Sequence, residues 1–292
     1  MKKNVDKFFF LLWKILSPIS FVKFIFSPQK SIDKKKSYLG KLPELETISN
    51  LINLELFNSN EFNKKIKTAK ESTDLYGFSF DCYEFLSNQL RNKIYNFAKN
   101  NSKITNLTNS FLGLNGTLNT ISIYANVPRA SDLEIGSKMW HRDGNTYLAA
   151  DFMFAISEIN DENGPFYWID PKDFGHAQHY KSDNHIGWES SGRFTDENLF
   201  NFGLKKDKIQ KFIGKPGSYI LLNTGESFHK GGFCNTQVRI LGRFVYSSFG
   251  YSKGNLHKYN NINENKRFTF PISHRLYTYH EKIFRNIINK IK

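Results

Sequence analysis

Three features are scarce or missing in this chain of 292 residues: cysteine, long apolar runs and internal repeats. The two cysteines, Cys82 and Cys234, are too few for a disulfide framework, so the sequence favours a reducing, cytoplasmic environment over secretion. Lysines interrupt the most apolar region before it reaches about 18 residues, so a membrane-spanning helix is not expected. No repeat of any period is visible.

The formal net charge of +14 is concentrated at the two ends of the chain. Residues 1–36 carry nine lysines against two aspartates, and residues 253–292 carry nine lysines and arginines against two glutamates. The middle, residues 37–252, is neutral, with 23 basic and 23 acidic residues. Nucleic-acid binding is therefore not expected, because it needs a basic face on the folded module itself.

Residues 1–30 have the pattern of an amphipathic helix. Lys3, Lys7 and Lys14 fall on one stripe at helical spacing, and large apolar residues cover the rest. Pro18 stops or kinks the run, and no small-residue cleavage site of a signal peptide follows it. The segment is either an interfacial helix on an anionic membrane or a terminal helix packed on the domain, and we favour peripheral membrane contact.

The main body of the sequence changes character from helical to strand-like. Residues 34–50 look like a short linker, and from about residue 44 to residue 105 apolar residues recur at roughly helical spacing. Short β-branched and aromatic runs follow: TLNTISIYANV, TYLAADFMFAIS, GPFYWID, GSYILLNT and VRILGRFVYSSFGY. Helices first and strands afterwards predict an α+β chain built on a sheet sandwich or barrel.

We divide the chain into three parts. Residues 1–36 form the basic amphipathic N-terminal segment, residues 37–270 a folded domain, and residues 271–292 a basic amphipathic C-terminal helix. Within the domain, a polar stretch at about residues 172–212 interrupts the strands. An insertion of that length is usually a functional lid or a disordered loop.

The motif MWHRDGNTY places His141 and Asp143 two residues apart, so in an extended chain both side chains point the same way. Further on, His229 lies in a glycine-rich turn after a strand, and Arg239 opens the next strand. Two histidines and one carboxylate from separate strands make the facial triad that binds non-haem Fe(II) and leaves coordination positions open. A nearby arginine would hold the far carboxylate of a bidentate oxo-acid cosubstrate.

The motifs WHRDG, AISEINDENGPFYWID, GKPGSYILLNTGESFHKGG and VR together resemble the phytanoyl-CoA dioxygenase-type Fe(II)/2-oxoglutarate oxygenases, over roughly residues 115–250. The resemblance implies a double-stranded β-helix, a cupin-like jelly roll with flanking helices. It implies that His141, Asp143 and His229 bind Fe(II) and that Arg239 binds the 5-carboxylate of 2-oxoglutarate. It also implies O₂-dependent hydroxylation of a small-molecule or lipid-like substrate, because the carboxylate ligand that related chlorinating enzymes lack is present.

One position departs from the family pattern. A common aspartate before the TG-like turn is Asn223 in this sequence, which puts a local hydrogen bond in question and leaves the ligand set unchanged.

Each candidate residue also has an ordinary structural interpretation. Asp143 could cap the Gly144-Asn145 turn, and His229 could lie in a solvated turn. Arg243 lies on the same strand face as Arg239 and competes with it as the anchor, and either arginine could form a surface salt bridge. Taken together and in this order, the residues favour the triad.

Several other residues receive weaker assignments. Cys234 is expected to be a small buried residue, since no paired base is identifiable. His176, His179 and His185 lack the carboxylate or cysteine support of a zinc site. Three residues of the insertion are candidates for contact with the substrate: Trp188, Arg193 and Phe194.

Two other functions stay open. One is a His₂Asp zinc metallohydrolase whose metal-bound water is the nucleophile, a reaction for which Arg239 has no role. The other is a non-catalytic jelly-roll module associated with membranes through its basic ends.

Overall fold

The computed structural model describes residues 32–33, 35–74, 77–113, 115–128, 134–143, 149–174 and 192–247. The predicted N-terminal amphipathic segment lies outside these residues, except for its last few positions, as does the predicted C-terminal helix. Among the described residues, no helix has the length and apolar character needed to cross a bilayer.

The N-terminal half of the domain is helical, as predicted. Serine and asparagine side chains cap three of its four helices by accepting a hydrogen bond from a backbone N–H of the first turn. Each helix turns a stripe of apolar side chains inward. The helices are α3 (Pro43–Asn58), α4 (Asn60–Glu71), α5 (Asn88–Asn100) and α6 (Ser102–Leu112).

The strands form two antiparallel sheets. The large sheet has the order β1 (Tyr38–Lys41), β7 (Ser218–Leu222), β4 (Ala149–Ala155), β9 (Arg239–Ser247), β3 (Thr117–Asn126) and β2 (Ser79–Asp81). The small sheet has the order β6 (Gln210–Phe212), β5 (Phe166–Ile169) and β8 (Phe228–Gly231). After β4 the chain crosses to the small sheet for β5 and β6, returns to the large sheet for β7, and crosses again for β8 and back for β9. Repeated crossing between two facing sheets is the connectivity of a double-stranded β-helix.

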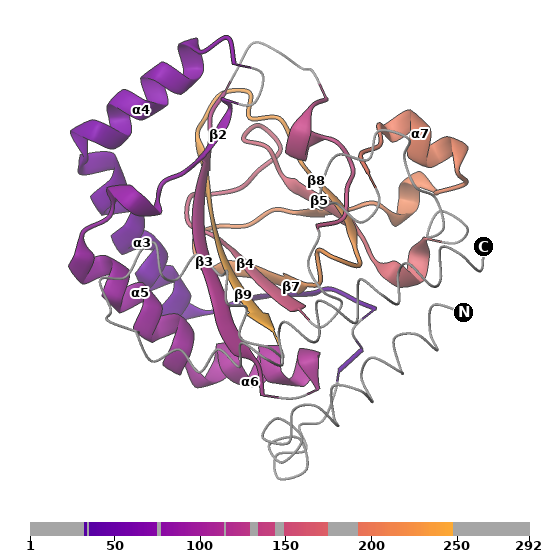
Figure 1. Cartoon of the computed structure of the whole chain (residues 1–292), viewed down its shortest axis with the longest axis horizontal. Coiled ribbons are helices and arrows are strands. Elements are labelled where there is room, and N and C mark those ends of the chain that lie inside the picture. The colour runs from indigo at the N-terminus through magenta and orange to yellow at the C-terminus, as the bar shows by residue number, and fades with distance from the viewer. Residues whose placement is uncertain are drawn as a thin grey trace, which may run out of the picture.

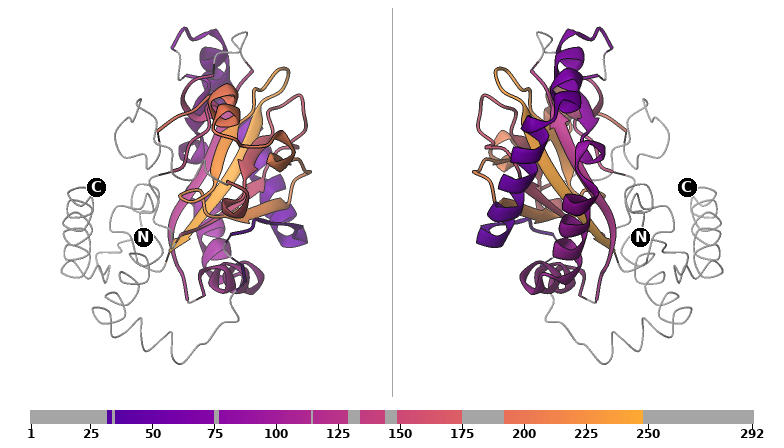
Figure 2. Two further views of the ribbon diagram at one scale, coloured as in Figure 1. Left: turned by 90° about the vertical axis from the view of Figure 1, so that its right-hand side faces the viewer. Right: turned by 90° about the vertical axis from the view of Figure 1, so that its left-hand side faces the viewer.

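Helices α3, α4 and α5 cover the outer face of the large sheet, and the small sheet lies against its inner face (Figures 1 and 2). The alternation of side chains along β4 supports this layering. Phe152 and Phe154 belong to the core beneath the helices, whereas Met153 and Ala155 belong to the core between the sheets. The short helix α7 (Asp196–Asn201) lies on the opposite side, beside β5 and β8 (Figure 1).

The five predicted strand runs are confirmed as β3, β4, β5, β7 and β9. The predicted linker at residues 34–50 is wrong, because it contains β1 and the start of α3. Strand β1 pairs with β7 in the register Tyr38↔Leu221, and Leu42 N–H donates to Gly217 O at 3.1 Å. A four-residue edge strand flanked by lysines has the composition of a linker, and only its pairing partner shows otherwise.

The predicted insertion at residues 172–212 is described only in part, since residues 175–191 lie outside the described ranges. Its remainder is packed structure. Leu199 of α7 is buried in a cluster on the outer side of the small sheet, and β6 pairs with β5.

Candidate metal centre

The backbone brings the two histidines side by side. His141 N–H donates to His229 O at 3.0 Å, and His229 N–H donates to His141 O at 2.9 Å. Residue 141 therefore forms an antiparallel bridge with β8, on the edge that does not pair with β5. Asp143 N–H donates to Thr224 O at 3.0 Å. His229 therefore belongs to a short strand and not to a solvated turn, and both histidines are buried.

The three predicted ligand side chains converge on one point. Asp143 Oδ1 lies 3.6 Å from His141 Nε2 and 3.6 Å from His229 Nε2. One ligand atom from each residue lies within 4.8 Å of the other two. A metal ion with bonds of about 2.0–2.2 Å holds ligand atoms at separations close to these, so one ion can bind all three.

Both histidines are oriented by the same local contact. His141 Nδ1 lies 2.8 Å from Met139 O, and His229 Nδ1 lies 3.1 Å from Ser227 O. A carbonyl oxygen only accepts, so each Nδ1 carries the proton and each Nε2 presents a lone pair. Fixing the tautomer in this way is how proteins prepare histidine for a metal.

The charges at the site suit a divalent cation. Burial alone would raise the pKa of Asp143, but Arg243 and the two histidines outweigh it and hold that pKa well below its usual range. Burial, with a smaller contribution from His229, lowers the pKa of His141. These shifts favour an uncharged His141 imidazole beside an ionised Asp143 at neutral pH, donors that suit a 2-His-1-carboxylate metal site.

Asp143 uses its second oxygen for an ion pair. Arg243 Nη2 lies 2.8 Å from Asp143 Oδ2, and Arg243 Nε lies 2.8 Å from Asp151 Oδ1. Asp151 is completely buried and also accepts from the Thr224 hydroxyl at 2.8 Å. These residues form a closed network around the carboxylate.

Arg239 lies on the same face of β9 but has different partners. Its Nε and Nη2 donate to Asn126 Oδ1 at 3.2 and 2.8 Å, and its Nη1 donates to Gly164 O. Within the described residues its hydrogen-bond partners are an amide and a carbonyl and include no carboxylate, and burial lowers its pKa. The sequence left open a surface salt bridge for either arginine. That interpretation is wrong for both, because β9 directs their side chains between the two sheets, where Leu241 also lies.

Asn223 makes a local hydrogen bond of its own, since its side-chain oxygen accepts from Gly225 N–H at 2.9 Å. The turn before β8 thus has a side-chain acceptor at position 223. Asparagine at this position leaves the triad geometry in place.

Sequence analysis missed three residues around the centre. Asp151 is the one charged residue in the apolar run AADFMFA, and a buried carboxylate in such a strand was the available signal. Thr224 gave no signal beyond its place in the turn. Arg142, between the two ligands, is buried over the Phe228 ring at 4.8 Å, and its Nε has no hydrogen-bond partner among the described residues.

The remaining candidates divide into three groups. Cys234 is buried as predicted, with its thiol 3.1 Å from Asn163 O. Phe194 packs against Phe228 in the outer cluster, and its backbone pairs with Trp140. Arg193 donates to Gly136 O. Outside the described residues lie His176, His179, His185 and Trp188.

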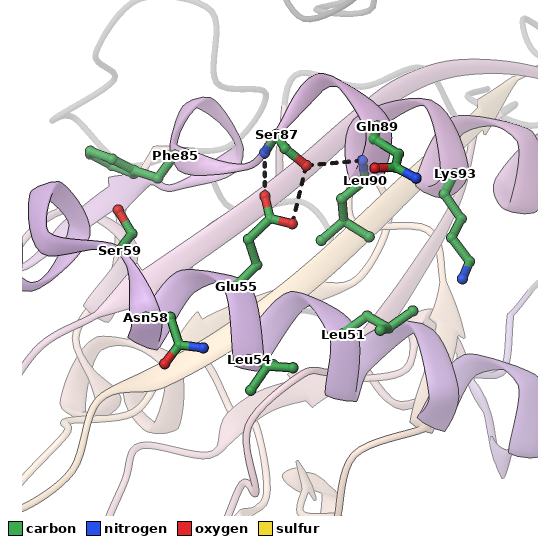
Figure 3. Close-up of a pocket in the computed structure, with 10 residues that line it drawn as sticks. All are labelled: Leu51, Leu54, Glu55, Asn58, Ser59, Phe85, Ser87, Gln89, Leu90 and Lys93. Carbon is green, nitrogen blue, oxygen red and sulfur yellow. Dashed lines mark hydrogen bonds between the residues drawn. The ribbon is translucent and has the colours of Figure 1, made fainter.

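Two pockets lie away from the triad. One, of 580 Å³, opens between α3 and α5, where Glu55 accepts from the Ser87 hydroxyl at 3.1 Å (Figure 3). The other, of 540 Å³, lies at the small sheet, where Lys230 Nζ contacts Glu134 at 3.0 Å and Asp196 at 2.6 Å.

Comparisons with known proteins give structural similarity without sequence matches. No family model matches the chain, and no curated protein matches it. Among solved structures, EctD from S. alaskensis in its apoform is 17% identical, with a TM-score of 0.45 over 79% of this chain and 77% of that chain. The non-haem alpha ketoglutarate dependent epimerase SnoN from nogalamycin biosynthesis is 11% identical, with a TM-score of 0.44 over 80% of both chains. The carbocyclase SnoK from the same biosynthesis is 10% identical, with a TM-score of 0.45 over 80% of this chain and 85% of that chain.

Proposed function

We propose that this protein is a non-haem Fe(II)- and 2-oxoglutarate-dependent dioxygenase of the phytanoyl-CoA dioxygenase type, and that it hydroxylates a small-molecule or lipid-like substrate. The observation that carries the proposal is the convergence of His141, Asp143 and His229, with both imidazoles oriented by backbone carbonyls. Three ligands on one side of an ion leave the other positions for cosubstrate and O₂.

Arg239 supports 2-oxoglutarate as the cosubstrate. A guanidinium group has five N–H donors, and its contacts to Asn126 and Gly164 use three of them, which leaves two. A buried cation without a carboxylate partner is costly, and an incoming carboxylate would satisfy both its charge and its donors.

The position of Arg239 relative to the triad also fits a dicarboxylate. A Cβ placed on Gly231 would lie 3.3 Å from Arg239 Nη2, so this glycine leaves room for the guanidinium. Gly231 lies two residues after His229 on β8, on the same face and about 6.6–6.8 Å further along the strand. A five-carbon dicarboxylate can bridge that separation.

When bound, Fe(II) with 2-oxoglutarate supplies the oxidising chemistry, in which one atom of O₂ enters a substrate C–H bond and the other enters succinate as CO₂ is released. In this reaction His141, Asp143 and His229 hold the metal, and Arg239 orients the cosubstrate. A zinc hydrolase would use the same three ligands but would have no role for Arg239, a buried arginine that has no carboxylate partner in the described part of the chain.

The experiment is a turnover assay on the full chain. Purified protein receives Fe(II), 2-oxoglutarate and O₂ with a panel of small-molecule and amphiphilic substrates, and succinate is measured. Fe(II)-dependent succinate release that disappears in His229→Ala supports the proposal. Substrate hydrolysis with Zn²⁺ and no succinate with Fe(II) would replace it with the hydrolase.

A further inference from the structure

Asp143 divides its two oxygens between two partners. Oδ1 faces the Nε2 atoms of His141 and His229, each at 3.6 Å, whereas Oδ2 accepts from Arg243 Nη2 at 2.8 Å. The oxygen that faces the histidines is free to bind a metal, and the other is engaged. A carboxylate held in this way can offer a metal only one oxygen.

Arg243 is itself held in place by buried groups. Its Nε donates to Asp151 Oδ1 at 2.8 Å, and its Nη2 lies 3.0 Å from Thr224 Oγ1. Asp151 Oδ2 accepts from Thr224 N–H at 3.0 Å and from its hydroxyl at 2.8 Å. Thr224 O in turn accepts from Asp143 N–H at 3.0 Å, which closes a ring of four residues.

The charges in this ring favour a bound cation. One guanidinium and two carboxylates leave one net negative charge. Asp151 neutralises Arg243, so the arginine can orient Asp143 without cancelling the charge that attracts a metal ion. Because every member is hydrogen-bonded and Asp151 is completely buried, the ring has little freedom to rearrange.

We propose that Arg243 is a positioning residue that fixes Asp143 in a one-oxygen binding mode toward the metal, with Asp151 balancing its charge. This inference rests on the proposed metal-binding function and assigns Arg243 a role distinct from that of Arg239. Residues that support metal ligands in this way typically change metal affinity by about 10–100-fold when they are altered.

The test is calorimetric titration of the metal-free full chain with Mn²⁺, with no 2-oxoglutarate present. Arg243→Lys keeps the positive charge but loses the forked geometry, and we expect its Kd for Mn²⁺ to rise about 10–100-fold. The double variant Arg243→Met/Asp151→Asn removes Arg243 together with the carboxylate that balances its charge, keeps Asp143, and should show a similar rise. If Arg243→Lys does not fold, the Mn²⁺ affinity of the double variant tests the positioning role instead.

Arg91→Lys is the matched control, since it makes the same exchange at a partly buried arginine of α5, whose Nε donates to Leu86 O and which has no role in the candidate metal centre. Its Mn²⁺ affinity without cosubstrate should equal that of the unmodified protein. Mn²⁺ binding at full affinity in both Arg243 variants, together with its loss in His229→Ala, would overturn the positioning role and leave the metal site intact. Equal binding by the unmodified protein and His229→Ala would instead contradict the proposed function itself.

Discussion

His141 and His229 donate backbone hydrogen bonds to each other, at 3.0 and 2.9 Å, while their imidazole rings face the same point with centroids 4.3 Å apart. The spacing of the two predicted ligands is therefore set by a β-bridge and not by the side chains. The bridge uses backbone atoms alone, so replacing the histidine side chains leaves its hydrogen-bonding groups in place.

That relationship gives the first prediction. His141→Ala and His229→Ala should each weaken metal binding by more than about 100-fold, because losing a ligand costs more than altering a residue that supports one. Each variant loses one hydrogen bond from Nδ1 to a carbonyl, so the free energy of unfolding of the metal-free protein should fall by less than about 2 kcal/mol. Metal titration and thermal unfolding of the same samples check both parts. A variant that unfolds without metal would contradict the backbone argument.

The second prediction concerns the cosubstrate. Arg239→Ala should weaken 2-oxoglutarate binding steeply, since truncating one partner of a buried charge pair costs about 2–5 kcal/mol. Titration of the Mn²⁺-loaded protein with 2-oxoglutarate measures the change. Arg243→Lys, compared at saturating metal, should weaken 2-oxoglutarate binding much less, because Asp143 and Asp151 already pair with that arginine. If Arg243→Lys weakened 2-oxoglutarate binding more than Arg239→Ala did, Arg243 and not Arg239 would be the cosubstrate anchor.

The third prediction tests the layered core. Gly242 of β9 lies opposite Phe154 of β4, and a Cβ on Gly242 would come within 2.2 Å of the Phe154 ring. Gly242→Ala should destabilise the protein by about 1–3 kcal/mol in chemical denaturation, since the added methyl group would overlap the fully buried Phe154 ring. Adding Phe154→Leu should recover part of the loss. Additive losses in the double variant would show that the ring does not cause the effect.

The order of helices and strands was predictable from the sequence because each long element shows its own period. The runs that became β3, β4 and β9 have β-branched and aromatic residues bounded by turn residues. Strands β1, β2, β6 and β8 have three or four residues each, too few for a period to appear. Their existence depends on pairing with strands far away in the sequence.

The triad was predictable for a similar reason, and the surrounding ring was not. His141 and Asp143 show the spacing of a shared strand face, and His229 follows at a strand end. The pairing of Arg243 with Asp151 depends on the register of β9 on β4, where Met153 lies opposite Arg243. Sequence spacing alone put Arg239 and Arg243 on one face and gave no means of telling their partners apart.

The fourth prediction concerns the basic N-terminal segment, which lies outside the described residues. The lysine stripe and apolar face predict binding of the full chain to anionic vesicles, since each basic residue near such a surface contributes about 1 kcal/mol. Full-length protein with Lys3, Lys7 and Lys14 changed to Gln should bind less, and salt should weaken the binding of both forms. Co-sedimentation with vesicles measures this. Equal binding by both forms, or none by either, would contradict membrane contact through this segment.

The central claim is that His141, Asp143 and His229 bind Fe(II) for 2-oxoglutarate chemistry. The most direct measurement is succinate formation by the full chain, supplied with 2-oxoglutarate and O₂, with and without Fe(II), beside Asp143→Ala under the same conditions. The account predicts succinate only with Fe(II) and only from the unmodified protein. Succinate formed at the same rate by Asp143→Ala would contradict it.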